Sequence, residues 1–115
     1  MIKTPLEIAQ SLIQFDTTNP PGNERLCIEF LDDLLTESGF ETTLLARDEN
    51  RPNLLARLKG RGEAPPMLFQ GHVDVVTTEG QDWSVNPFQG EIKDGFLWGR
   101  GTLDMKGAVA MMVSS

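Results

Sequence analysis

The chain has 115 residues and a formal net charge of −7, with one histidine, one cysteine and no tyrosine. This length predicts a single small domain, and a pI near 4.5 argues against nucleic acid as a partner, because phosphate backbones attract clustered lysine and arginine. The single cysteine excludes an intramolecular disulfide framework, and no apolar run approaches the ~20 residues that span a bilayer.

A capping box marks the start of a first helix. Thr4 is a good N-cap residue, Pro5 suits the first helical position, and Glu7 completes the box three residues after the cap. An apolar stripe then continues to Phe15. The segment 16–22 ends the helix, because its two prolines have no amide proton to donate.

A second helix is predicted from Asn23, its expected N-cap, to Gly39, which suits a left-handed helix end. Its buried stripe follows helical spacing and consists of Cys27, Phe30, Leu31, Leu34 and Leu35. Because Cys27 lies on this stripe, we interpret it as a small core residue rather than a nucleophile.

Three strands, a hairpin and a final helix are predicted next. The strands are residues 40–46, 53–58 and 67–70, and the last is almost entirely apolar, as expected of a strand covered on both sides. Asp94-Gly95 is a two-residue turn signal between residues 91–93 and 96–98. Helical propensity returns from about Lys106 in an apolar, methionine-rich pattern. This order resembles the first half of an α/β domain, so we expect an N-terminal piece of a longer protein.

The chain's one imidazole belongs to the segment 70–76. His72 directly follows the third predicted strand, and sites collect at the carboxyl ends of strands in open α/β sheets. In an extended backbone His72 and Asp74 would point to the same side, where the carboxylate can fix the imidazole tautomer and strengthen it as a metal ligand. The alternative is a loop histidine with local hydrogen bonds only, because His-x-Asp is a short motif that occurs freely.

A glycine-rich loop at 99–107 presents a second carboxylate, Asp104. A dinucleotide fingerprint would need glycine at this position, and a phosphate-binding P-loop would need Gly-Lys-Ser/Thr, so both are excluded. Asp104 is therefore either a helix cap or a ligand. If the two strands are neighbours, His72 and Asp104 can converge, and an imidazole with a carboxylate is an ordinary zinc ligand set. An aspartate can also bridge two metal ions ~3.5–4 Å apart.

In order along the chain, these motifs resemble those of one family. They are Gly-His-Val-Asp-Val-Val at 71–76, Trp83, Asn-Pro-Phe at 86–88, Asp94-Gly95 and Gly-Arg-Gly-Thr-Leu-Asp-Met-Lys-Gly at 99–107, with Asp-Thr-Thr-Asn-Pro-Pro-Gly upstream at 16–22. The family is that of the co-catalytic zinc enzymes acetylornithine deacetylase, succinyl-diaminopimelate desuccinylase, aminoacylase and glutamate carboxypeptidase. The resemblance implies the N-terminal half of a three-layer α/β/α catalytic domain with a mixed sheet, over residues 1–115, without the lid or dimerisation domain.

The resemblance also assigns roles to single residues. It implies that His72 is a ligand of one metal, that Asp104 bridges two divalent metal ions (zinc, with cobalt as the alternative), and that Asp74 is the catalytic-site carboxylate that orients His72. The peptide bond after Asp104 is expected to be cis. The implied reaction of the full-length parent is metal-dependent hydrolysis of an amide bond in N-acyl amino acids or small peptides, of the deacetylase, deacylase or carboxypeptidase type.

The family also requires a Glu-Glu pair, a further acidic ligand and a late histidine, which cannot be placed in these 115 residues. We therefore expect this chain alone to be inactive and to bind metal weakly. The alternative is a non-catalytic acidic binding module that uses Trp83, Phe88 and Trp98 as an apolar contact surface. We expect a cytoplasmic protein with a small-molecule substrate and neither nucleic acid nor membrane as a partner, and uncovered sheet edges that favour homo-oligomers or a larger assembly.

Overall fold

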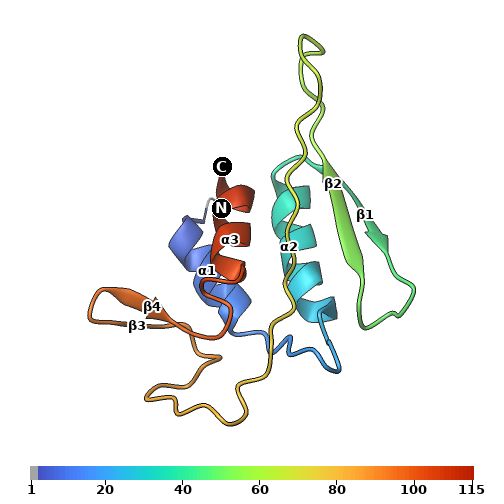
Figure 1. Cartoon of the computed structure of the whole chain (residues 1–115). Helices are drawn as coiled ribbons and strands as arrows, with labels where there is room; N and C mark the ends of the chain where they lie inside the picture. Colours follow the sequence, from blue (N-terminus) through green and yellow to red (C-terminus); the bar gives the residue numbers. More distant parts are fainter. Residues whose placement is uncertain (1–2) are drawn as a thin grey trace.

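The computed structural model describes residues 3–115, which fold into helices and short strands and confirm the α/β class (Figure 1). In chain order the elements are α1 (Pro5–Ile13), α2 (Arg25–Glu37), β1 (Glu41–Leu45), β2 (Asn53–Arg57), β3 (Glu91–Lys93), β4 (Phe96–Trp98) and α3 (Lys106–Ser114). Across these described residues, every helix is too short or too polar to cross a membrane.

The predicted start of α1 is confirmed. The Glu7 amide donates to Thr4 Oγ1 at 3.2 Å, and the Thr4 amide donates to the Glu7 carboxylate at 2.7 Å, so both halves of the capping box are formed. This reciprocal pair satisfies two amide groups that would otherwise lack partners at the helix start.

The predicted cap of α2 is wrong. Glu24, not Asn23, is the N-cap residue, and its side chain makes no capping hydrogen bond. Its buried carboxylate instead pairs with Arg51, at 2.9 Å from the guanidinium, which ties the start of α2 to the loop before β2. The helix end is as predicted, because Gly39 adopts a left-handed φ of 92°.

One hydrophobic core joins the three helices. α1 and α3 pack against each other (Figure 1), and α2 contributes a third face. The fully or nearly buried members are Ile8, Ala9, Leu12, Cys27, Ile28, Leu31, Val73, Val109 and Ala110. Cys27 is completely buried, and burial raises the pKa of its thiol to about 11, so its interpretation as a core residue is confirmed.

Both sheets among the described residues are two-stranded and antiparallel. β1 and β2 pair from Glu41 opposite Arg57 to Leu45 opposite Asn53, and their inner face lies on α2 (Figure 1). β3 and β4 form the predicted hairpin, in which Asp94 and Gly95 have φ values of 54° and 78°. Positive φ at both central residues is the backbone that a tight hairpin turn requires.

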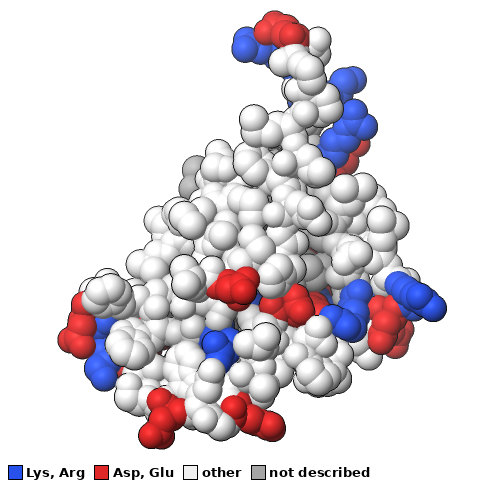
Figure 2. Space-filling model, in the orientation of Figure 1, with Lys and Arg blue, Asp and Glu red and all other residues white. Residues whose placement is uncertain are grey.

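The predicted strand at residues 67–70 is not formed. Met67, Leu68 and Phe69 are 80%, 81% and 62% exposed, on an extended stretch that runs back from β2 past α2 (Figure 1). A buried strand needs hydrogen-bonded neighbours, and residues 3–115 place none beside this segment. Figure 2 shows a broad area without charged side chains between the tip of the long loop and the lower part of the molecule.

Candidate functional site

His72 and Asp74 lie on one side of an extended segment, as their spacing predicts. The residues that alternate with them, Val73 and Val75, are buried in the core, so the imidazole and the carboxylate face outward. This alternation is the period of two that an extended backbone imposes. The segment therefore anchors its valines in the interior and presents its two polar groups at the surface.

Asp104 lies on the tight loop that leads into α3. The Lys106 amide donates to the carbonyl oxygen of Gly101 at 2.8 Å, which closes the loop, and the peptide bond between Asp104 and Met105 is cis, as the family resemblance implied. The N-cap of α3 is Met105, and no side chain caps the helix. Asp104 therefore does not serve as the helix cap, and its side chain is 86% exposed.

The two expected partners meet. His72 Nε2 lies 3.3 Å from Asp104 Oδ1, although the residues come from different segments of the chain. On the other edge of the ring, His72 Nδ1 lies 2.9 Å from Asp74 Oδ1 and 3.1 Å from the backbone oxygen of Asp74. The imidazole thus lies between two carboxylates, one at each nitrogen, and the predicted convergence of His72 and Asp104 is confirmed.

A third side chain holds Asp74. The side-chain amide of Asn19 donates through Nδ2 to Asp74 Oδ2 at 3.1 Å, while Asp74 Oδ1 faces His72. The hydrogen bond from Asn19 is the largest cause that lowers the pKa of the Asp74 carboxyl, the neighbouring His72 and Arg51 lower it further, and burial acts in the opposite direction. The carboxylate is therefore stabilised in its charged form.

The distance between His72 and Asp104 fits a shared metal ion. Zinc binds imidazole nitrogen at about 2.0–2.1 Å and carboxylate oxygen at about 2.0–2.2 Å, so two such ligands on one tetrahedral ion lie about 3.3–3.5 Å apart. The observed separation is 3.3 Å. Over residues 3–115, no group of three or more histidine, cysteine, aspartate or glutamate side chains is arranged to hold a metal.

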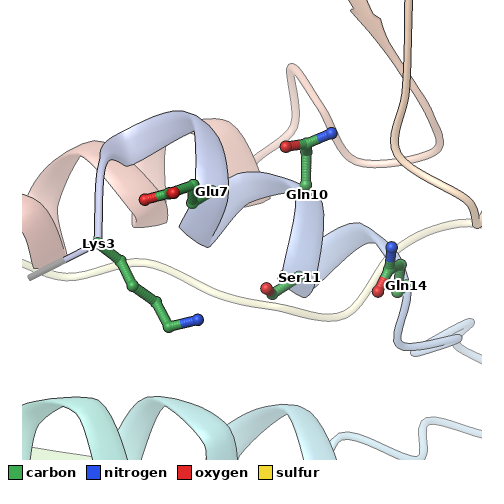
Figure 3. A pocket seen from close by; sticks show the side chains of 5 residues that line it. All are labelled: Lys3, Glu7, Gln10, Ser11 and Gln14. Carbon is green, nitrogen blue, oxygen red and sulfur yellow. The ribbon is translucent and has the colours of Figure 1, made fainter. Parts of the chain in front are cut away.

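A surface hollow beside α1 offers no comparable convergence. Its lining side chains spread along the outside of the helix in different directions (Figure 3), and they are those of Lys3, Glu7, Gln10, Ser11 and Gln14. The amide groups of Gln10 and Gln14 are already bound to the backbone oxygens of Gly90 and Gln89, at 3.0 and 3.2 Å. This hollow includes none of the residues of the candidate site.

Sequence reasoning missed Asn19 as a contact of Asp74. The segment 16–22 resembles the family in sequence, but no local pattern connects Asn19 to a carboxylate 55 residues later. Arg100, in the glycine-rich loop, lies over the Trp83 ring at 5.4 Å and donates to Gln81 and to the Thr77 backbone oxygen. Arg100 thus holds the loop that contains Trp83.

Comparisons with known proteins agree with the motifs. Residues 68–115 match the model of peptidase family M20/M25/M40. The chain is 40% identical to a succinyl-diaminopimelate desuccinylase of Methylorubrum populi over 98% of its own length and 30% of the relative's. For the enzymes of the same name from Ehrlichia canis and Wolbachia pipientis the identities are 37% and 35%, over 96% of this chain and 29% and 27% of the relatives.

The chain thus spans less than a third of the length of these relatives. The matched region contains His72, Asp74 and Asp104, the three residues for which the motifs predicted a role. Residues 68–115 thus match peptidase family M20/M25/M40, and nearly the whole chain is similar to part of the succinyl-diaminopimelate desuccinylases.

Proposed function

We propose that this chain supplies part of the metal site of a hydrolase that cleaves an amide bond in an N-acyl amino acid or small peptide. The observation that carries the proposal is the position of the His72 ring, with Asp104 Oδ1 3.3 Å from Nε2 and Asp74 Oδ1 2.9 Å from Nδ1. The desuccinylases that the chain resembles point to an N-succinyl amino acid as the first substrate to test.

The three side chains would divide the work by position. Asp74 accepts the Nδ1 proton of His72, which leaves the Nε2 lone pair free as a ligand on the side of Asp104. The exposed Asp104 carboxylate has two oxygens, which suits a ligand shared between two ions. Bound divalent ions, zinc or cobalt, would polarise the amide carbonyl and lower the pKa of a water molecule.

We also propose that residues 1–115 form the N-terminal segment of a larger catalytic domain, and that the segment alone is inactive. Two observations support this. The chain matches less than a third of the length of its relatives, and its apolar run at 67–69 is exposed. Exposed apolar patches of this kind mark surfaces that another part of a protein covers. The residues that would complete the metal site, and the general base, would come from the rest of the domain.

The test is an assay of the full-length parent with zinc or cobalt on N-succinyl and N-acetyl amino acids and on dipeptides. We expect His72→Ala and Asp104→Asn to lose roughly 100-fold or more in kcat/KM, because loss of a ligand should exceed the 10–100-fold effect of outer-shell changes. Asp94→Asn is the matched control: Asp94 lies in the β3–β4 turn at a φ of 54°, where asparagine is well tolerated. An active His72→Ala enzyme, or a parent that hydrolyses none of these substrates, would refute the proposal.

The non-catalytic binding module has less support. Its aromatic side chains are partly buried and locally engaged: Trp98 Nε1 donates to the Lys93 backbone oxygen at 3.1 Å, and the Trp83 ring lies under Arg100. Rings with these local roles present less free apolar surface to a partner. No observation in residues 3–115 favours this function over the hydrolase.

A further inference from the structure

Residues 16–19, just after α1, lie alongside residues 73–75 in a fixed register. The Val75 amide donates to the Thr17 backbone oxygen at 3.1 Å, and the Asn19 amide donates to the Val75 backbone oxygen at 2.8 Å, which forms a parallel bridge between Thr18 and Val75. The buried Thr17 hydroxyl adds a third bond, to the Val73 backbone oxygen at 2.5 Å. The backbone alone therefore brings position 19 next to Asp74.

The Asn19 side chain completes a two-point hold on the Asp74 carboxylate. Oδ2 accepts from Asn19 Nδ2 at 3.1 Å, and Oδ1 lies 2.9 Å from His72 Nδ1. With a partner at each oxygen, the carboxylate cannot rotate about its Cβ–Cγ bond without losing a hydrogen bond. A carboxylate held only by His72 would keep that rotation, and the imidazole would gain the same freedom.

The fixed carboxylate in turn determines which ring nitrogen carries the proton. His72 Nδ1 faces two acceptors, the Asp74 carboxylate at 2.9 Å and the Asp74 backbone oxygen at 3.1 Å, whereas Nε2 faces one Asp104 oxygen at 3.3 Å, so the hydrogen bonds favour Nδ1 as the donor. Nε2 is then the nitrogen with a lone pair, and it lies on the side of Asp104. A hydrogen bond to one ring nitrogen sets the state of the other in this way in metal-binding histidines generally.

We propose that Asn19 is a positioning residue of the metal site, which holds Asp74 in the orientation that keeps His72 in its Nδ1–H form with Nε2 available to a divalent cation. This inference rests on the proposed function, because it assumes that His72 is a ligand. Asn19 itself touches neither the cation nor the substrate; it acts through Asp74 on His72.

The test uses NMR on the 115-residue chain, where His72 is the only imidazole and its ring nitrogen signals need no assignment by mutation. The ring nitrogen shifts at alkaline pH report the tautomer without metal, and a zinc titration of the same signals gives a dissociation constant. The variants are Asn19→Leu, which removes the donor at similar volume, and Asn19→Gln, which keeps it. Thr18→Val is the control, because the Thr18 hydroxyl bonds to Asp16 and not to Asp74.

We expect the Nδ1–H form to dominate in the wild-type chain and to decline in Asn19→Leu, with a rise of about tenfold in the zinc dissociation constant. Thr18→Val should stay within twofold of the wild type, and Asn19→Gln should recover part of the loss. The Val75 amide signal reports whether the backbone bridge has survived each substitution.

Two results would overturn the proposal: an Nε2–H form in the wild-type chain, or an Asn19→Leu chain with an intact bridge and unchanged tautomer and zinc affinity. If Asn19→Leu does not fold, the tautomer of His72 in the wild-type chain still tests the proposal. Whether His72 is a ligand is decided separately, by the activity of His72→Ala in the full-length parent, which separates failure of the proposed function from failure of the positioning role.

Discussion

Gly107, in the first turn of α3, provides the sharpest test of how the Asp104 loop is packed. A Cβ atom at this position would lie 2.2 Å from the backbone oxygen of Thr102, about 0.8 Å short of the 3.0 Å below which such contacts essentially never occur. Because the obstacle is backbone, no rotamer change relieves it. Gly107→Ala must therefore push α3 away from the turn at Thr102, and Asp104 lies between the two.

Whether Gly107→Ala raises or lowers the free energy of unfolding depends on two opposing contributions. Alanine in place of glycine favours a helix by about 1 kcal/mol. Overpacking costs about 1–3 kcal/mol, and a backbone clash belongs at the upper end of that range. We therefore expect Gly107→Ala to lower the free energy of unfolding by about 1–2 kcal/mol, which shifts a urea midpoint downward by about 1 M for a small protein.

Two further glycines calibrate the measurement. Gly60→Ala is the control, because a Cβ there meets no atom within 4 Å. Gly71→Ala should lie between the two, since its Cβ would meet only side-chain ends, those of Met105, Val109 and Met112 at 3.1 Å. Urea unfolding of the three variants should give the order Gly60→Ala, Gly71→Ala, Gly107→Ala from most to least stable. A Gly107→Ala chain as stable as the wild type would refute this account of the loop.

Three other predictions concern the core, the cysteine and the exposed apolar run. Leu12→Ala removes a completely buried side chain and should lower the free energy of unfolding in urea by about 2–5 kcal/mol. Leu6→Ala, in the same helix but at a position that is 46% exposed, should lower it by less than about 1 kcal/mol. Equal losses in the two variants would contradict the assigned core. Burial raises the pKa of Cys27 to about 11, so an alkylating reagent at pH 8 should label the thiol only after denaturation, and rapid labelling of the native chain would contradict this. Leu68→Glu should reduce the concentration-dependent self-association that sedimentation velocity measures, while Leu26→Glu, at another exposed leucine, should not. Equal effects of the two substitutions would mean that residues 67–69 do not form the self-association surface.

The elements that the sequence predicts correctly are those whose signal and contact are both local. Thr4 and Glu7 are three residues apart and cap the same turn. Asp94 and Gly95 form a turn whose geometry their own backbone preferences decide. In both cases the stabilising interaction involves neighbours in the chain, so no knowledge of the tertiary structure is needed.

The wrong predictions have the opposite character. Asn23 is a good cap residue, but α2 begins after Glu24, whose carboxylate is buried against Arg51, 27 positions away. Residues 67–70 have the composition of a buried strand, yet a strand exists only where another strand pairs with it. Local sequence preference determines secondary structure only weakly. In both cases a distant partner decided the outcome: Arg51 is present for Glu24, and within residues 3–115 a pairing strand is absent for residues 67–70.

The candidate site combines the two kinds of information. That His72 and Asp74 share a side follows from the period of two, and this part was predictable. The meeting of His72 with Asp104 depended on whether their two segments are neighbours in space, and the contact of Asn19 with Asp74 had no sequence signal. Side chains that converge from three segments leave no local periodicity by which to find them.

Lys106 explains why those three segments keep their places. It is completely buried, a position that lysine rarely occupies, and its ammonium group donates to the Phe15 backbone oxygen at 2.8 Å. Phe15 directly precedes the segment of Asn19, and Lys106 comes two residues after Asp104. This hydrogen bond therefore links the loop of Asp104 to the segment that holds Asp74, while Gly71 lies against the side chains of Met105, Val109 and Met112. The separation of His72 and Asp104 is thus a consequence of how α3 packs on α1, and a substitution that loosens this packing should disturb the site without touching any of its polar residues.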